Sequence, residues 1–231
     1  MELALEWARP FLGGALVVLQ IFAVALVLTV VIGLLGASAK LSGSRALRWL
    51  AHAYTTVFRG TPEVLILLIL YFGSAVSLTA LVRLFRPEIQ FVDIPPFWAG
   101  SLALGLIVGA YATETFRGAF QGVPKGQVEA ARALGLSGWQ VFFYVRLPQM
   151  WRLALPTFGN HMLSLMKDTA LISIIGLEEI MYTAKIATSV TSKPFTMYAM
   201  VGVIYLLFTW LIALLVGRLE RGATRHLMES R

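Results

Sequence analysis

The stretch VEAARALGLSGWQVFFYVRLPQ, residues 128–149, separates two long apolar runs and carries more local order than a simple connector requires. Just before it, Pro124 can begin a helix, and good helix formers continue that helix over residues 127–134. Gly135 follows at the position where glycine commonly ends a helix. The sequence therefore predicts a short, sharply terminated helix in this loop.

A second helix is predicted directly after the glycine. Ser137 and Gln140 have the S-x-x-Q spacing of a capping box, and Leu147-Pro148 is expected to break the helix before the next apolar run. A helix of two turns is not stable alone in water, so the first helix must pack against something. Two alternatives remain: a connector packed on its own bundle, or a docking element for a cytoplasmic partner.

The composition is that of a membrane protein. Of 231 residues, 58% are hydrophobic and 13% are charged, against about 45–50% and about 25% in soluble domains. The mean hydropathy is +0.77. The net charge of +7 is explained by basic residues that border membrane spans, so no nucleic-acid partner is predicted. Cysteine is absent, which excludes disulfides and thiolate metal sites.

Five runs are long and apolar enough to cross a bilayer as helices. We expect an all-α polytopic membrane protein with one transmembrane domain over residues 1–231. The first run is far longer than the apolar core of a cleaved signal, so it is expected to be a retained span. Lys167 and Asp168 interrupt the fourth run. The predicted spans are 11–36, 64–82, 96–113, 153–177 and 195–217.

Lysine and arginine residues gather on one predicted side of the membrane. They are concentrated in the loops 37–63 and 117–152 and after residue 217, so this side is expected to be cytoplasmic. The N-terminus is then outside and the C-terminus inside. Residues 44–59 alternate polar and apolar side chains with helical spacing, which predicts an amphipathic helix on the inner face.

Several blocks of the chain resemble one family. Glu129-Ala130-Ala131, Gly135 and Leu147-Pro148 have the spacing of the EAA motif in permease subunits of bacterial ABC importers, with Val145 where isoleucine is usual. The blocks FRGTP, AYATETFRGAFQGVPKGQVEAARALG and KDTALISIIGLEE resemble the polar amino-acid branch, in particular the histidine/lysine/arginine/ornithine and opine permeases. These blocks are residues 58–62, 110–135 and 167–179.

The resemblance implies the architecture of a type I ABC importer. The loop 117–152 would carry a coupling helix that seats on a separate ATP-binding subunit. The chain lacks the G-x-x-x-x-G-K-[ST] phosphate loop, so it is expected to hold no cofactor, and ATP and Mg²⁺ would bind to that partner. The resemblance assigns the ATPase contact to Glu129, Ala130, Ala131, Leu134 and Gly135.

The same resemblance implies an assembly in the bacterial inner membrane. Five spans are too few to enclose a path, so a second permease subunit is expected. A similar but non-identical chain is favoured, and a homodimer is the alternative. Two ATP-binding subunits and a periplasmic substrate-binding protein complete the expected set of partners.

Charged residues near the membrane need partners or a cavity. Glu114 and Arg117 are three residues apart on one helix face and are expected to form a local ion pair. Asn160, Ser164 and Asp168 form a polar stripe at four-residue spacing. The residues of this stripe either make hydrogen bonds to other helices or line a translocation path.

By analogy with the family, the candidate path residues are Tyr71, Met166, Thr169, Ser173 and Glu178. A carboxylate such as Glu178 would suit the ammonium or guanidinium of a basic substrate. The expected function is therefore import of a polar, basic amino acid or an opine, without enzymatic chemistry. The alternatives are the same class of importer with a neutral or acidic amino acid or another small polar solute, and a self-sufficient secondary carrier.

Overall fold

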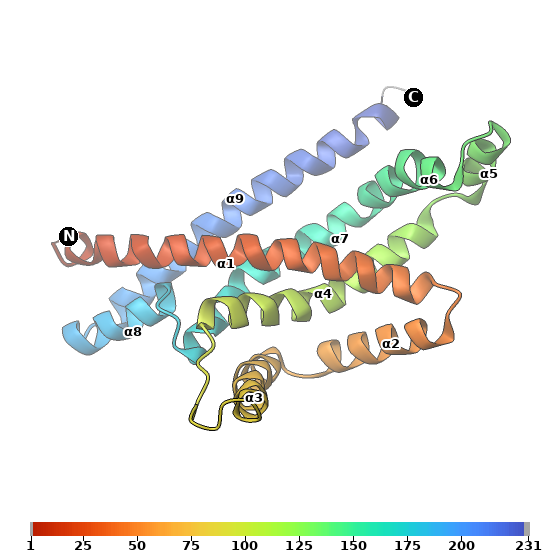
Figure 1. Cartoon of the computed structure of the whole chain (residues 1–231). Coiled ribbons are helices and arrows are strands. Elements are labelled where there is room, and N and C mark those ends of the chain that lie inside the picture. The colour runs from red at the N-terminus through yellow and green to blue at the C-terminus, as the bar shows by residue number, and fades with distance from the viewer. Residues whose placement is uncertain (1, 229–231) are drawn as a thin grey trace.

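The computed structural model describes residues 2–228, with side chains described from residue 6 to residue 223. In this range the chain is helical, and the helices form an elongated bundle with a loop region at one end (Figure 1). The elements are α1 Glu2–Leu41, α2 Arg45–Gly60, α3 Glu63–Arg83, α4 Pro96–Gly122, α5 Lys125–Ala133, α6 Gly138–Gln140, the π-helix η1 Val141–Arg146, α7 Leu147–Asp168, the 3₁₀-helix η2 Thr169–Ile175, α8 Ile180–Thr191 and α9 Pro194–Met228.

Close backbone approach joins α1 to α4 along most of their length (Figure 1). A Cβ atom added at Gly33 of α1 would lie 2.8 Å from the Cβ of Ala112 in α4. A Cβ atom added at Gly109 of α4 would lie 2.9 Å from Cγ2 of Ile32 in α1. Small residues on both helices therefore allow tight packing, which is the usual basis of helix association in a bilayer.

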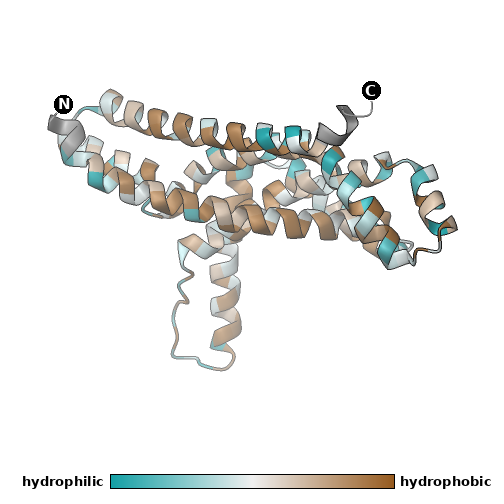
Figure 2. Cartoon of the chain, turned by 90° about the horizontal axis from the view of Figure 1, so that it is seen from above, coloured by the Kyte–Doolittle hydropathy of each residue, from teal (hydrophilic) through white to brown (hydrophobic). Residues whose placement is uncertain are grey.

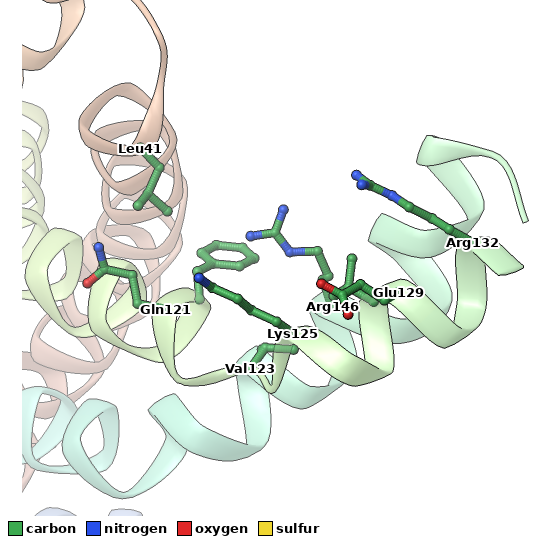
Figure 3. A pocket seen from close by; sticks show the side chains of 9 residues that line it. Leu41, Gln121, Val123, Lys125, Glu129, Arg132 and Arg146 are labelled. Atoms are coloured by element: carbon green, nitrogen blue, oxygen red, sulfur yellow. The ribbon is translucent and has the colours of Figure 1, made fainter.

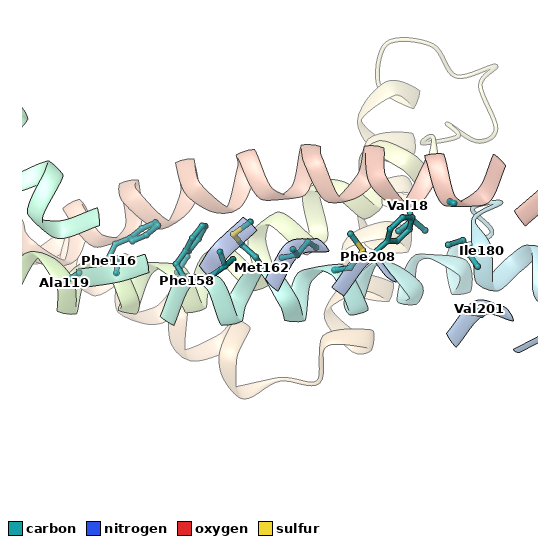
Figure 4. Packing of buried hydrophobic residues seen from close by; sticks show 14 of the residues in the cluster. Val18, Phe116, Ala119, Phe158, Met162, Ile180, Val201 and Phe208 are labelled. Carbon is teal, nitrogen blue, oxygen red and sulfur yellow. The ribbon is translucent and has the colours of Figure 1, made fainter. Parts of the chain in front are cut away.

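The buried core lies between α1, α4, α7, α8 and α9 (Figure 4). Aromatic and sulfur-containing side chains fill it near its centre. Phe116 of α4 packs its ring against Phe158 of α7 with centroids 5.3 Å apart, and Met162 and Phe208 continue the cluster toward α8. A second cluster joins α1, α3, α4 and η2 around Leu104. These contacts hold the long helices in one unit.

Four helices of the described residues are long and apolar enough to cross a membrane: Glu6–Leu41, Glu63–Arg83, Pro96–Gly122 and Pro194–Ala223. They match the first, second, third and fifth predicted spans. The predicted fourth span, 153–177, is not continuous α-helix. Its helix α7 ends at Asp168, and the chain continues as the 3₁₀-helix η2 to Gly176, which has φ +88°. The count of five spans and the orientation stay predictions.

One helix, α8, and the length of another, α4, were not anticipated. After Gly176, α8 forms a separate helix capped by Glu179, whose carboxylate accepts a hydrogen bond from the backbone N–H of Tyr182 at 3.0 Å. Helix α4 continues to Gly122, nine residues beyond the predicted end of its span at residue 113. In this extension Glu114 pairs with Lys40 of α1, and the Thr115 hydroxyl lies 2.9 Å from Nε2 of His161 in α7, contacts that charge-free runs do not reveal.

Helix α3 projects from the rest of the bundle (Figures 1 and 2). Its buried contacts are confined to a few residues against α4 and η2, including Ile66 and Leu67. Large apolar side chains elsewhere on it, such as Ile69, Phe72 and Val76, are exposed. An apolar helix with so little cover within its own chain is suited to contact with lipid or another membrane subunit.

The amphipathic helix predicted over residues 44–59 is confirmed as α2. Ser44 caps it by accepting a hydrogen bond from the backbone N–H of Leu47 at 3.4 Å. Ala51 and Thr55 are buried toward α1 and α4, while Trp49 is exposed.

Candidate coupling surface and translocation path

The coupling loop begins at the end of α4 with the short helix α5. Its C-terminus is a complete Schellman turn, in which Gly135 N–H donates to the Arg132 carbonyl at 2.9 Å and Leu136 N–H donates to the Ala131 carbonyl at 3.2 Å. Gly135 has φ +83°, a left-handed conformation that glycine adopts without the steric cost of a side chain. The prediction that Gly135 terminates this helix is confirmed.

The capping box after Gly135 is confirmed as well. Ser137 N–H donates to Oε1 of Gln140 at 2.9 Å, and Gln140 N–H donates to Oγ of Ser137 at 3.4 Å. The predicted break at Leu147-Pro148 is wrong. Backbone hydrogen bonding passes through the π-helix η1 directly into α7, so Pro148 lies in the first turn of α7.

The π turn explains why the proline does not interrupt the chain. Proline lacks an N–H and its ring crowds the carbonyl of the preceding turn in a regular α-helix. In η1 the Leu147 N–H donates to the Phe142 carbonyl, five residues back, so the helical turn just before Pro148 is wider than an α-helical turn. As a result, α6, η1 and α7 form one continuous helical rod from the loop toward the core.

The predicted coupling residues lie on different faces of this loop. Ala131 is buried, whereas Glu129, Ala130 and Leu134 are exposed. Glu129 lines a cavity between α5 and the end of α4. Gly135 shapes the turn and makes no contact within 4 Å at its would-be Cβ position.

Large apolar side chains are exposed at the tip of the loop. Leu134 is 81% exposed, and Trp139 and Tyr144 are each 73% exposed. Trp139 stacks on Phe143 with ring centroids 4.2 Å apart, which orders the ring without covering it. Exposed apolar clusters on ordered structure commonly mark an interaction surface. Sequence reasoning missed Trp139 and Tyr144, although two aromatic residues in a loop between predicted spans were the available signal.

A buried ionic cluster lies beside the coupling loop, where α1, α2 and α4 meet. The predicted pair is confirmed, because Arg117 Nε donates to Glu114 at 2.9 Å. Lys40 of α1 also pairs with Glu114, with only 2% of its side chain exposed, and it donates to Oγ1 of Thr55 at 2.6 Å. Lys40 was not anticipated, since 74 residues separate it from Glu114 in the sequence. Because a buried ion needs its partner, this cluster fixes α2 against the α1–α4 pair.

Two of the candidate path residues are packed inside this chain. Met166 and Thr169 are fully buried where α7 gives way to η2. Thr169 donates to the Met166 carbonyl at 2.7 Å, and its hydroxyl lies 3.3 Å from the hydroxyl of Tyr205 in α9. Tyr205 in turn lies 3.5 Å from the buried carboxylate of Glu179. Tyr205 and Glu179 therefore hold the end of α7, and neither had been singled out from sequence.

The other three candidates are more open and do not form one cluster. Tyr71 and Ser173 are half-exposed, on α3 and η2 respectively. Glu178 is exposed and lines a separate cavity of about 360 Å³ with Trp7 and Tyr182. None of the other four candidates lines that cavity.

Two of the three residues in the polar stripe of α7 are open, and the third, Asp168, is half-buried at the end of the helix. Asn160 and Ser164 are exposed, and neither side chain forms a hydrogen bond among the described residues. Nearby, His161 lies 2.9 Å from the Thr115 hydroxyl, and the Arg59 guanidinium lies 5.4 Å from the centre of the Tyr111 ring. Exposed polar groups at membrane depth are stable only beside water or another protein surface.

Comparison with known proteins identifies the family. Residues 29–225 match the family model described as binding-protein-dependent transport system inner membrane component. The chain belongs to this family. Its members are permease subunits and not enzymes, and this permease is accordingly an inner-membrane protein.

Curated relatives agree over most of the chain. This permease is 43% identical over 198 residues to the histidine/lysine/arginine/ornithine transport system permease protein HisQ of Escherichia coli, with 86% of each chain covered. It is 42% identical to the arginine ABC transporter permease protein ArtQ of the same species, covering 78% of this chain and 81% of the relative. The nopaline transport system permease protein NocQ of Agrobacterium fabrum is 40% identical, with 88% and 86% covered.

Solved structures support the fold. A crystal structure of an amino acid ABC transporter with histidines superposes with a TM-score of 0.78 at 31% identity and covers 94% of this chain and 95% of that one. The inward-facing MetNI methionine ABC transporter superposes with a TM-score of 0.73 at 18% identity, covering 95% and 98%, which is a likeness of fold alone. The EAA-loop permease architecture predicted from the sequence is therefore confirmed.

Proposed function

We propose that this permease is the membrane subunit of an ATP-driven importer that translocates a basic amino acid or an opine delivered by a periplasmic binding protein. ATP is hydrolysed on a separate subunit, because the chain has no phosphate-binding loop of its own. The observation that carries the coupling part of this proposal is the ordered tip of the loop, with Leu134, Trp139 and Tyr144 exposed on helical structure.

The tip is suited to docking on the ATPase. It combines one aliphatic and two aromatic side chains, the types that dominate the energy of protein interfaces when they are buried in a partner's groove. The small residues Ala130 and Ala133 lie beside Leu134 on the exposed side of α5, so a partner can approach the helix backbone closely. The turn at Gly135 holds α5 and α6 in a fixed relation, so docking of one orders the other.

The continuous rod from α6 to α7 provides a mechanical connection. A displacement of the tip by nucleotide-driven closure of the ATPases would be carried along η1 and α7 to Asp168, where the α-helix ends. The 3₁₀-helix η2 and left-handed Gly176 then form a local change of direction that can absorb movement. Ser173, a candidate path residue, lies in η2, so a motion of α7 would change the position of Ser173.

The substrate class is inferred from the relatives and from charge. The relatives named above are permeases for histidine, lysine, arginine and ornithine, for arginine, and for nopaline. The candidate path residues are Tyr71, Met166, Thr169, Ser173 and Glu178. Of these, Tyr71 and Ser173 have side chains with open surface near α3 and η2, and Met166 and Thr169 would act from within the core. Glu178 supplies a carboxylate for a cationic ligand.

A second permease subunit is needed to complete the path. The exposed polar residues Asn160 and Ser164 of α7 are poorly suited to lipid, and a second subunit would cover them. The exposed apolar surface of α3 is suited to contact with the same subunit as well as with lipid. The partner is expected to be a similar, non-identical chain, with a homodimer as the alternative. Two ATP-binding subunits and the binding protein complete the importer.

Affinity purification from the native host tests this proposal. The tagged chain is extracted in mild detergent, and co-purified proteins are identified by mass spectrometry. We expect an ATP-binding subunit and a second permease, and uptake of a basic amino acid that requires ATP. Purification of an active chain alone, with transport that persists without ATP, would refute the proposal in favour of a secondary carrier. A Leu134→Ala/Trp139→Ala variant should release the ATP-binding subunit, whereas Trp98→Ala, an exposed tryptophan at the start of α4, should retain it.

A further inference from the structure

A cavity of about 580 Å³ lies between α5 and the ends of α1 and α4 (Figure 3). Its apolar lining is formed by Leu41, Phe120, Val123 and Val128. This volume is in the range of small-molecule sites in proteins. The cavity lies on the face of α5 that is turned away from Leu134, so docking at the loop tip does not require it.

The polar lining of the cavity is predominantly cationic. Lys125, Arg132 and Arg146 contribute three positive charges, and Glu129 contributes one negative charge. Among the residues that the structure describes, none of these four side chains takes part in an ion pair within 4.0 Å. The Arg146 guanidinium is held 5.8 Å from the centre of the Phe120 ring, which orients it over the apolar floor. The site thus presents oriented, uncompensated positive charge beside an apolar surface.

The position of the cavity relates it to the membrane. Leu41 is the last residue of α1, a helix that is long and apolar enough to cross a membrane. The cavity therefore lies at one end of this helix. In the predicted orientation this end of α1 is at the cytoplasmic leaflet, where anionic lipid head groups are found.

We propose that this cavity binds the phosphate head group of an anionic phospholipid of the inner leaflet. Lys125, Arg132 and Arg146 would contact the phosphate, and the glycerol and upper acyl chain would lie over Phe120 and Leu41. Basic pockets at the cytoplasmic ends of membrane helices have the charge and the polarity gradient that such a head group requires. This proposal goes beyond the transport function and does not depend on the identity of the transported substrate.

The apolar lining of the cavity favours a lipid over an acidic side chain of the ATPase. A side chain from a soluble subunit would use the charges but not the apolar side chains of Leu41, Phe120, Val123 and Val128 beside them. A lipid uses both, because its phosphate and its acyl chain are joined. Since two of the three cations are on α5, a bound head group would also tie the coupling helix to the membrane surface.

Native mass spectrometry of the purified transporter tests the proposal. The complex in detergent is titrated with phosphatidylglycerol or with phosphatidylcholine, and bound lipids are counted. The test variant is Lys125→Gln/Arg132→Gln, because both side chains are exposed and glutamine preserves helix propensity. The matched control is Arg45→Gln/Arg218→Gln, which removes two exposed cations outside the cavity.

We expect the transporter to bind phosphatidylglycerol in preference to phosphatidylcholine. The test variant should bind phosphatidylglycerol about 25-fold more weakly, because each of the two lost charges is expected to weaken binding about fivefold. The control variant should bind like the wild type. Equal weakening in both variants would overturn the proposal in favour of general surface charge. If soluble glycerol phosphate displaces phosphatidylglycerol as effectively as the lipid itself does, the site recognises a free phosphate and not a membrane lipid, and the proposal is overturned. If the test variant binds phosphatidylglycerol as the wild type does, the proposal is overturned. If that variant also loses the ATP-binding subunit, the cavity is instead a contact site for the ATPase.

Discussion

The substitution Gly135→Asp tests whether the loop acts as an ordered coupling element. Gly135 has φ +83°, and a residue with a Cβ atom pays about 1–2 kcal/mol in that conformation. A carboxylate at the C-terminal end of α5 adds an unfavourable interaction with the helix dipole of about 0.3–1 kcal/mol. No atom lies within 4 Å of the new Cβ, so the cost is conformational and electrostatic and not a steric clash.

The sum is about 2 kcal/mol, which corresponds to a reduction of about 30-fold in the population of the native turn. Since a two-turn helix has little stability of its own, the cost is expected to fall on the loop and not on the membrane bundle. We expect uptake of a radiolabelled basic amino acid by intact cells to fall at least about tenfold, with a normal amount of the protein in the membrane.

Gly138→Asp is the matched control for this experiment. It places the same charge three residues along in the same loop, at the first position of α6, where an acidic residue is favoured and the backbone is not left-handed. Its Cβ would also meet nothing within 4 Å. Uptake by Gly135→Asp within twofold of the wild type at equal abundance would refute the reasoning. Equal loss in both variants would show that charge in the loop, and not the turn, is responsible.

Three further predictions concern packing, charge and substrate. Gly36→Val should overlap the side chain of Thr113 in α4 and destabilise the protein by about 1–3 kcal/mol, measured as a lower thermal midpoint in detergent. Gly73→Val on α3 meets open space and should leave the thermal midpoint unchanged; equal effects would contradict the α1–α4 packing. Lys40→Met should destabilise the protein by less than the about 3–5 kcal/mol expected for a buried charge left without any partner, because Arg117 still pairs with Glu114, and adding Glu114→Gln should restore part of the loss; no restoration would argue against coupling of Lys40 and Glu114. Glu178→Gln should reduce uptake of a basic amino acid more than uptake of a neutral one, and an equal effect on both would exclude recognition of charge by this residue.

Local features of the coupling loop were largely predictable from sequence. The Schellman turn at Gly135 and the capping box of Ser137 depend on residues within a few positions of one another. Their conformational preferences act before any tertiary contact forms. The break expected at Pro148 was wrong, because the widened turn of η1, which also contacts α5, carries the helix past the proline.

The polar interior was less predictable. The Glu114–Arg117 pair is local and could be foreseen from its spacing, but Lys40 reaches Glu114 only because α1 and α4 pack side by side. The contact of Tyr205 with Glu179 and Thr169 likewise joins elements that are distant in sequence. Helical periodicity indicates which face of a helix is polar and does not indicate which other helix meets it.

Composition and local pattern determined that the chain is a helical membrane protein with an ordered loop between its apolar runs, because hydrophobic length and turn preferences are properties of short segments. Only the tertiary structure decided that Ala131 is buried while Leu134 and Trp139 are exposed, and that Lys125 and Arg146 face one cavity. Those facts depend on how α5, η1 and the ends of α1 and α4 are placed relative to one another. That placement results from close packing summed over many distant residues, which no single segment encodes.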